Sequence, residues 1–169
     1  LVLWDEIRPT QRWLDAQLAG SPDADADSRD PQAVRLARAN STAGACLALG
    51  LRFAGSCAAP AMELLFDQVK ELHALRQAPT SPKAEQPTLE TCLGTAALAL
   101  SLAMPGSGNL QRLKLVRVRR RRVDTDVTYG FHMAIGMAIG FLFLGGGRLT
   151  LGTSKPAIAA LLAALFPRF

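Results

Sequence analysis

Three copies of one short apolar phrase constrain this chain more than any other feature of its sequence. Residues 48–51, 99–102 and 138–141 superimpose without gaps, at spacings of 51 and 39 residues. A polar loop over residues 77–88 accounts for the longer first spacing. Self-similarity at about 40 residues is typical of repeat proteins, in which each unit packs on its neighbours.

Each phrase leads into glycine and then into a second, amphipathic run. The glycines are Gly55, Gly106 and the triplet Gly145, Gly146 and Gly147. The second runs cover residues 61–75, 110–118 and 156–166. We therefore predict an all-α fold, an α-solenoid of helix–turn–helix repeats. The predicted units are a lead-in over residues 1–32 and three repeats, approximately 33–78, 89–123 and 127–169.

Small and large residues alternate in each phrase, and a period of two is also a strand signal. Alanine and glycine are poor strand residues, however, and a helix explains the pattern as well. On a helix, Gly44 and Ala48 form one small stripe, and Cys46 and Gly50 form another on the opposite side. We predict helices packed between neighbouring repeats. The equivalent small residues in later blocks are Ala99, Ser101, Ala138 and Gly140.

The lead-in differs from the repeats. A helix is predicted over residues 1–19, anchored by Trp4, Ile7 and Trp13, and an acidic, proline-containing loop over residues 20–31 follows it. The chain starts without methionine and stops inside an apolar stretch, so we expect it to be a piece of a longer polypeptide.

Residues 127–147 could be taken for a membrane span, with Gly136 and Gly140 as a GxxxG pair. Residues 131–144, which exclude the flanking glycines, would reach only about 21 Å, against roughly 30 Å of bilayer hydrocarbon. Equivalent positions in the other blocks hold Arg52 and Pro105. We favour a buried repeat helix and expect no membrane contact.

A basic cluster follows the second block. Its members are Arg112, Lys114, Arg117, Arg119, Arg120, Arg121 and Arg122. Such a run can bind nucleic acid or act as a nuclear import signal, but no aromatic residue interleaves for base stacking. We favour a solvated face or a contact with an acidic partner, and we expect no nucleic acid.

No residue pattern indicates catalysis, a cofactor or a metal. His73 and His132 each stand alone, and the three cysteines lack CxxC spacing, which favours a reducing intracellular setting. The glycine triplet before Arg148 lacks the spacing and the Lys-Ser/Thr pair of a phosphate loop.

The chain resembles a known family. The phrases that resemble it are AGACLALGLRFAGS (43–56), ETCL (90–93), GSGNL (106–110), YGFH (129–132) and GFLFLGGGR (140–148), and they are similar to the proteasome/cyclosome repeats of the largest subunit of the anaphase-promoting complex. The opening segment from Trp4 to Trp13 is similar to the lead-in of those repeats.

The resemblance implies a non-catalytic scaffold in a multi-subunit ubiquitin ligase that marks cell-cycle regulators for destruction. Its repeats would form an arc of a larger toroid that joins the platform of the complex to its substrate-recognition and coactivator module. Nucleus and cytoplasm would be its location. The alternatives are the related scaffold of the proteasome regulatory particle and an Ala/Gly-rich helical membrane protein.

Overall fold

The computed structural model describes residues 31–78, 82–120, 127–144 and 155. The predicted lead-in helix over residues 1–19, the glycine triplet at 145–147 and the run at 156–166 lie outside the described residues. The described elements are α3 (Pro31–Arg52), α4 (Ala59–Gln77), the 3-10 turn η2 (Lys83–Glu85), α5 (Gln86–Ala103), α6 (Leu110–Arg120) and α7 (Tyr129–Leu142).

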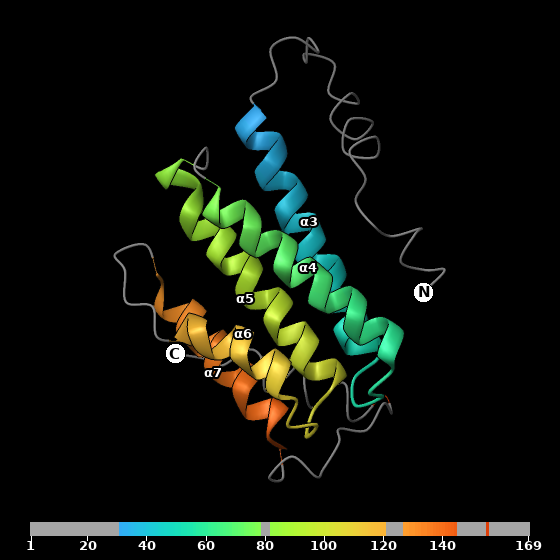
Figure 1. Ribbon diagram of the computed structural model, residues 1–169. Coiled ribbons are helices and arrows are strands. Elements are labelled where there is room, and N and C mark those ends of the chain that lie inside the picture. The colour runs from blue at the N-terminus through green and yellow to red at the C-terminus, as the bar shows by residue number, and fades with distance from the viewer. Residues whose placement is uncertain (1–30, 79–81, 121–126, 145–154, 156–169) are drawn as a thin grey trace.

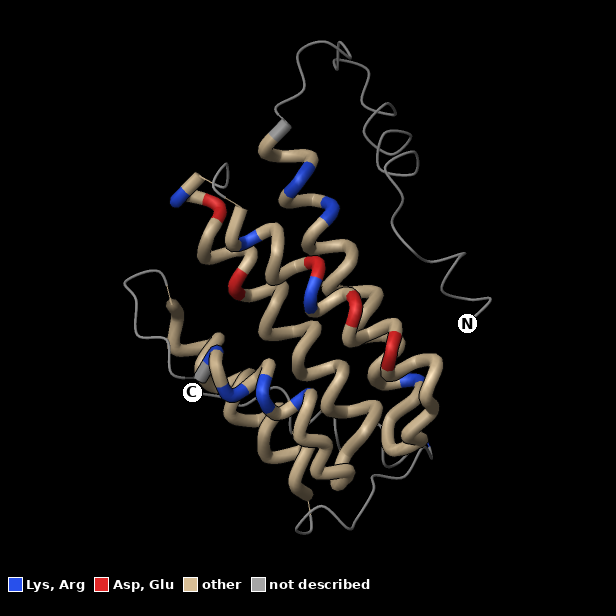
Figure 2. The backbone as a smooth tube through the Cα atoms, viewed as in Figure 1, with Lys and Arg blue, Asp and Glu red and all other residues tan. Residues whose placement is uncertain are grey.

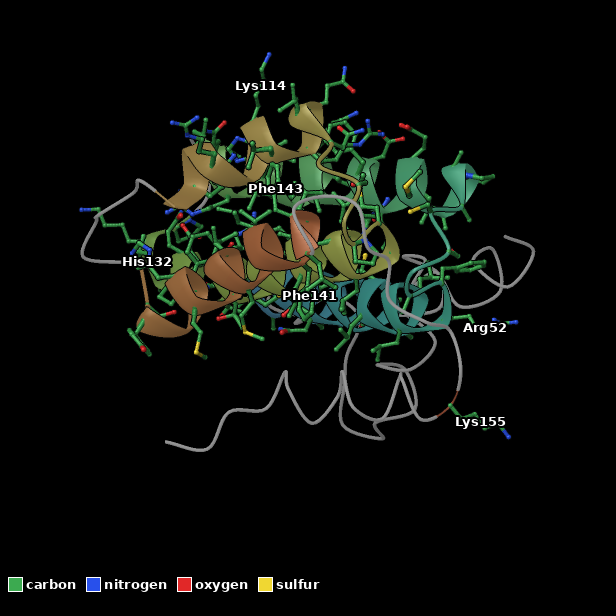
Figure 3. The ribbon with its side chains drawn as sticks, turned by 90° about the horizontal axis from the view of Figure 1, so that it is seen from below. Arg52, Lys114, His132, Phe141, Phe143 and Lys155 are labelled. Carbon is green, nitrogen blue, oxygen red and sulfur yellow. The ribbon has the colours of Figure 1, made fainter. Side chains whose placement is uncertain are left out.

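The helices lie in two layers. α3, α5 and α7 pack side by side in that order and form one layer, whereas α4 and α6 form the other. Figure 3, seen from below, shows α4 and α6 above the layer of three. α4 packs mainly against α5, and α6 packs against α7. Each second helix therefore lies on the first helix of the following unit, as a continuous solenoid requires.

The phrases that alternate small and large residues are helical. α3 ends at Arg52, α5 at Ala103 and α7 at Leu142, so the helix ends have the same spacings of 51 and 39 residues as the sequence phrases. The described residues contain helices and turns but no strand. The all-α solenoid prediction is confirmed, and the strand alternative is wrong.

Local sequence explains where several helices begin. The side chain of Asn109 accepts hydrogen bonds from the backbone N–H of Gln111 and Arg112, at 3.1 and 3.2 Å, before α6. Thr128 accepts from the N–H of Phe131 at 3.2 Å and caps α7. Asparagine and threonine are favoured at this position because their oxygens satisfy N–H groups that the helix itself leaves unpaired.

The predicted loop over residues 77–88 is shorter in the structure. η2 begins at Lys83 and α5 at Gln86, so the prediction of non-helical chain up to Thr88 is wrong. Pro87 lies in the first turn of α5, where its missing N–H costs no helical hydrogen bond. A proline that appeared to end the loop instead belongs to the helix start.

The hydrophobic core is centred on α5. Its buried residues include Leu93, Leu100 and Leu102, which join a cluster with residues of α3, α4 and α7. Among the described residues, none of the helices combines the length and the hydrophobicity needed to cross a membrane. α7 has 14 residues.

Candidate functional site

The turn after α3 is bonded to the end of α5. The N–H of Gly55 donates to the carbonyl of Leu102 and the N–H of Cys57 to that of Ala103, both at 3.0 Å. The last carbonyls of a helix have no partner within the helix. One repeat therefore supplies the hydrogen bonds that cap the next.

The turn after α5 repeats this arrangement against α7. Gly106 N–H donates to the carbonyl of Phe141 at 2.8 Å, and Gly108 N–H to that of Leu142 at 2.9 Å. The donors lie 51 residues, and the acceptors 39 residues, beyond those of the first turn. The hydrogen bonds at the two interfaces are thus separated by the same spacings as the repeated sequence phrases.

These turns need left-handed backbone. Gly55, Gly106 and Gly108 have φ of 71°, 68° and 58°. Cys57 occupies the position equivalent to Gly108 and has φ of 50°, which side-chain-bearing residues rarely adopt. The turn glycines predicted from sequence therefore position the backbone donors, and Cys57 does the same at a conformational cost.

Small residues let the first helices approach closely. A Cβ added to Gly50 would lie 2.7 Å from both the Cα and the carbonyl oxygen of Ala99. On the other side of α5, a Cβ on Gly94 would lie 3.3 Å from the Cβ of Ala134. Ser101 is buried, and its hydroxyl donates to the carbonyl of Ala97 at 3.0 Å.

The outer small stripes have no such neighbour among the described residues. Gly44 and Ala48 are exposed on α3, and a Cβ on Gly44 would meet no atom within 4 Å. The same holds for Gly140 on α7, although Ala138 beside it is buried. The predicted packing residues therefore divide into those that face a neighbouring helix of this chain and those that face outward.

A buried charge cluster that the sequence did not indicate joins α4, α5 and α6. Arg76 forms an ion pair with Glu90, and both side chains are almost fully buried. Arg119 of α6 is also buried; burial lowers the pKa of its guanidinium, whereas the nearby Glu90 carboxylate raises it. One carboxylate in the core thus faces arginines from both second helices.

A second link joins α6 to α4. Arg112 is buried, forms an ion pair with Glu63 and lies over the ring of Phe66, 4.7 Å from its centroid. Arginine suits such a site because its planar group can stack on a ring while its N–H groups bond a carboxylate. Arg112 therefore fastens the second-helix layer.

The basic residues predicted to form one surface lie on two different faces of α6. Arg112 and Arg119 point inward, whereas Lys114 and Arg117 are exposed. Figure 3 shows Lys114 pointing away from the other layer, and Figure 2 shows the basic residues gathered on α6. Arg121 and Arg122, and the side chain of Arg120, lie outside the described residues.

Two of the three thiols, Cys46 and Cys92, are buried, whereas Cys57 is exposed. Burial raises the pKa of Cys46 to about 12 and that of Cys92 to about 11. Thiolate is the reactive form of cysteine, so these thiols are poor nucleophiles. In the part of the chain that the structure describes, no three His, Cys, Asp or Glu side chains cluster as a metal site would.

Residues 1–169 match the family described as APC1 fifth domain. The chain belongs to this family. The match to the APC1 fifth-domain family includes residues 1–30 as well as α3–α7, so the lead-in and the described helices are parts of one family domain.

Relatives of this APC1 fifth-domain chain come from distant eukaryotes. It is 41% identical to anaphase-promoting complex subunit 1 of Homo sapiens, covering 100% of this chain and 9% of that protein. It is 49% identical to the Dictyostelium discoideum protein of the same name, covering 77% and 6%. A protein of Emericella nidulans named negative regulator of mitosis is 35% identical, covering 100% and 8%. The chain thus spans less than a tenth of the length of these three relatives.

Proposed function

We propose that this chain is a non-catalytic scaffold segment of the anaphase-promoting complex, organising other subunits for ubiquitination of cell-cycle regulators. The names of its relatives support membership in that complex. The observation that carries the scaffold role is the chain of turn-to-helix hydrogen bonds, Gly55 to Leu102 and Gly106 to Phe141. Such bonds join each described unit to the next, which is how a repeat array transmits a fixed geometry along its length.

In this proposal the three repeats are an arc of a toroid in the nucleus and cytoplasm. Its partners are other subunits of the complex, including its platform and its coactivator module. The non-catalytic role is supported by how the charged side chains are used. Glu63 and Glu90 form ion pairs that link helices.

We further propose that the outward face of α6 contacts an acidic partner subunit. All five acidic residues in the described ranges, Glu63, Asp67, Glu71, Glu85 and Glu90, already form ion pairs. Lys114 and Arg117 form none with described residues, and they are exposed between Leu110 and Val118, which are 67% and 65% exposed. Cations flanked by exposed apolar side chains suit an acidic segment with apolar anchors.

Affinity purification of the tagged chain from a cell extract tests both proposals. We expect recovery of the cullin-type and other subunits of the anaphase-promoting complex. Recovery of proteasomal ATPases instead would favour the proteasome scaffold. Nuclease treatment is the control for indirect capture through nucleic acid, and recovery that it abolishes would contradict an acidic protein partner.

A charge-reversed variant tests the α6 surface separately. Lys114→Glu with Arg117→Glu should lower recovery of one subunit and make the recovery that remains less sensitive to added salt, since salt weakens binding by screening the exposed charge pairs that this variant no longer forms. The matched control is Lys83→Glu in η2, which is exposed and distant in sequence. Unchanged recovery with the double variant would contradict the α6 contact while leaving membership in the complex intact.

A further inference from the structure

A groove between α3 and α4 has no helix over it among the described residues. It encloses a cavity of about 200 Å³. Its lining combines apolar and charged side chains, among them Val34, Arg38, Ala39 and Thr42 of α3, and Leu72 and Leu75 of α4. Leu75 is 39% exposed there.

The equivalent surface of the next unit is covered. The spacing of 51 residues places Leu89, Glu90 and Leu93 of α5 where α3 has Arg38, Ala39 and Thr42. All three α5 residues are at least 96% buried, and α4 packs on α5, with Arg76 paired to Glu90. The groove on α3 is therefore the place that a preceding second helix would fill.

The order of the chain identifies that helix. α4 comes directly before α5 and lies on it, and α6 comes directly before α7 and lies on it. By the same rule, the segment directly before α3 would lie on α3. We propose that residues 1–19 form this helix and dock into the groove between α3 and α4, with Trp13 as the main anchor.

The direction of packing selects Trp13. Arg76, in the last turn of α4, meets Glu90, in the second turn of α5, so a second helix and the helix after it run antiparallel. The later part of residues 1–19 would therefore face the first half of α3, where the groove lies. Ala39 replaces the glutamate of α5 and leaves room for an aromatic side chain, which buries about 150–250 Å².

The chain between residues 19 and 31 is long enough to let the first segment reach the groove. Eleven residues, 20–30, join the segment to α3, whereas eight, 78–85, join α4 to α5. At about 3.3 Å per residue, they span more than the 8–10 Å between packed helix axes. The family match covers these residues together with α3–α7, so the docked segment would complete one domain. This inference does not depend on which complex the chain serves.

Tryptophan fluorescence of the intact 169-residue chain tests it, because both tryptophans of the chain, Trp4 and Trp13, lie in the segment. The groove variants are Val34→Asp on α3 and Leu75→Asp on α4, and the matched control is Leu110→Asp on the exposed face of α6. Circular dichroism of each variant establishes that the helices are retained, and Leu75→Asp, being already partly exposed, keeps the test open if Val34→Asp unfolds.

We expect native emission to be blue-shifted from that of the urea-unfolded chain and protected from acrylamide. Either groove variant should shift the emission toward the unfolded value and remove the protection, whereas Leu110→Asp should leave both unchanged. Native emission like that of the unfolded chain would overturn the proposal. So would a blue shift that neither groove variant alters, or one that disappears on dilution, which would indicate a second copy in the groove.

Discussion

α5 and α7 occupy equivalent places in successive repeats, yet they are buried to different extents. Thirteen of the 18 residues of α5 are buried, but only Phe131, Ile135, Ala138 and Leu142 of the 14 in α7. α7 is nevertheless the more hydrophobic helix. Burial in this fold therefore depends on how many neighbours a helix has rather than on how apolar it is.

Each side of α5 is covered by a helix of the same layer. Gly50 of α3 rests on Ala99, and Ala134 of α7 lies against Gly94. On α7 a Cβ added at Gly136 or Gly140 would meet no atom of the described residues within 4 Å. The same small-residue pattern is thus a tight interface on one helix and an open surface on the other, and substitutions should separate the two.

Removing the charge buried on α5 should have the largest effect. Glu90→Ala would leave Arg76 and Arg119 buried without their carboxylate and should cost about 3–5 kcal/mol of unfolding free energy. Tyr129→Ala, at the equivalent position on α7 and 73% exposed, should stay within about 0.5 kcal/mol. Urea denaturation of both variants measures this. Equal losses would mean that the two helices do not differ as described.

A methyl group added at two equivalent glycines should change the stability of the protein in opposite directions. Gly50→Ala places a Cβ against the backbone of Ala99 and should destabilise by about 1–3 kcal/mol. Gly140→Ala places its methyl group where no described atom lies within 4 Å and should stabilise by about 0.5–1 kcal/mol, because alanine loses less backbone entropy in a helix. Thermal unfolding of both variants measures these changes in stability. A Gly50→Ala variant more stable than the original protein would refute the close approach of α3 and α5.

The turns after α3 and α5 differ at one equivalent position, where the first has Cys57 and the second has Gly108. Cys57→Gly should stabilise by about 1 kcal/mol, since it relieves a left-handed conformation, while Gly108→Ala should destabilise by a similar amount. Both backbone N–H groups keep their bonds to the helix ends. Denaturant midpoints measure the shifts, and a destabilising Cys57→Gly would show that the cysteine side chain matters more than the strain.

Thiol labelling should distinguish the turn from the helices with little effect on stability. At pH 8, iodoacetamide should modify exposed Cys57 and spare Cys46 and Cys92, because burial raises the pKa of the latter two to about 12 and 11. In urea all three should react. Mass spectrometry counts the adducts, and rapid native labelling of Cys92 would mean that α5 is less enclosed than its packing indicates.

Much of the fold could be predicted from sequence because repetition sets it. The phrases around Gly50, Ser101 and Gly140 gave helix class, order and register, and the helix ends follow the same spacings. The loop end was misjudged because Pro87 can either break a helix or begin one. The partner surface was only partly anticipated, since a run of arginines does not show which of them point inward.

By itself, the sequence determined the all-α solenoid, the spacing of its repeated phrases and the glycine turns that follow the first helices, because these depend on local periodicity and backbone freedom. Only the tertiary structure decided the roles of the charged residues. Buried Arg112 pairs with Glu63 and lies over the ring of Phe66, both from α4, and buried Arg119 is near enough to Glu90 of α5 for that carboxylate to raise its pKa. A buried charge is costly without a partner, and here the partners come from helices that only the folded chain brings together.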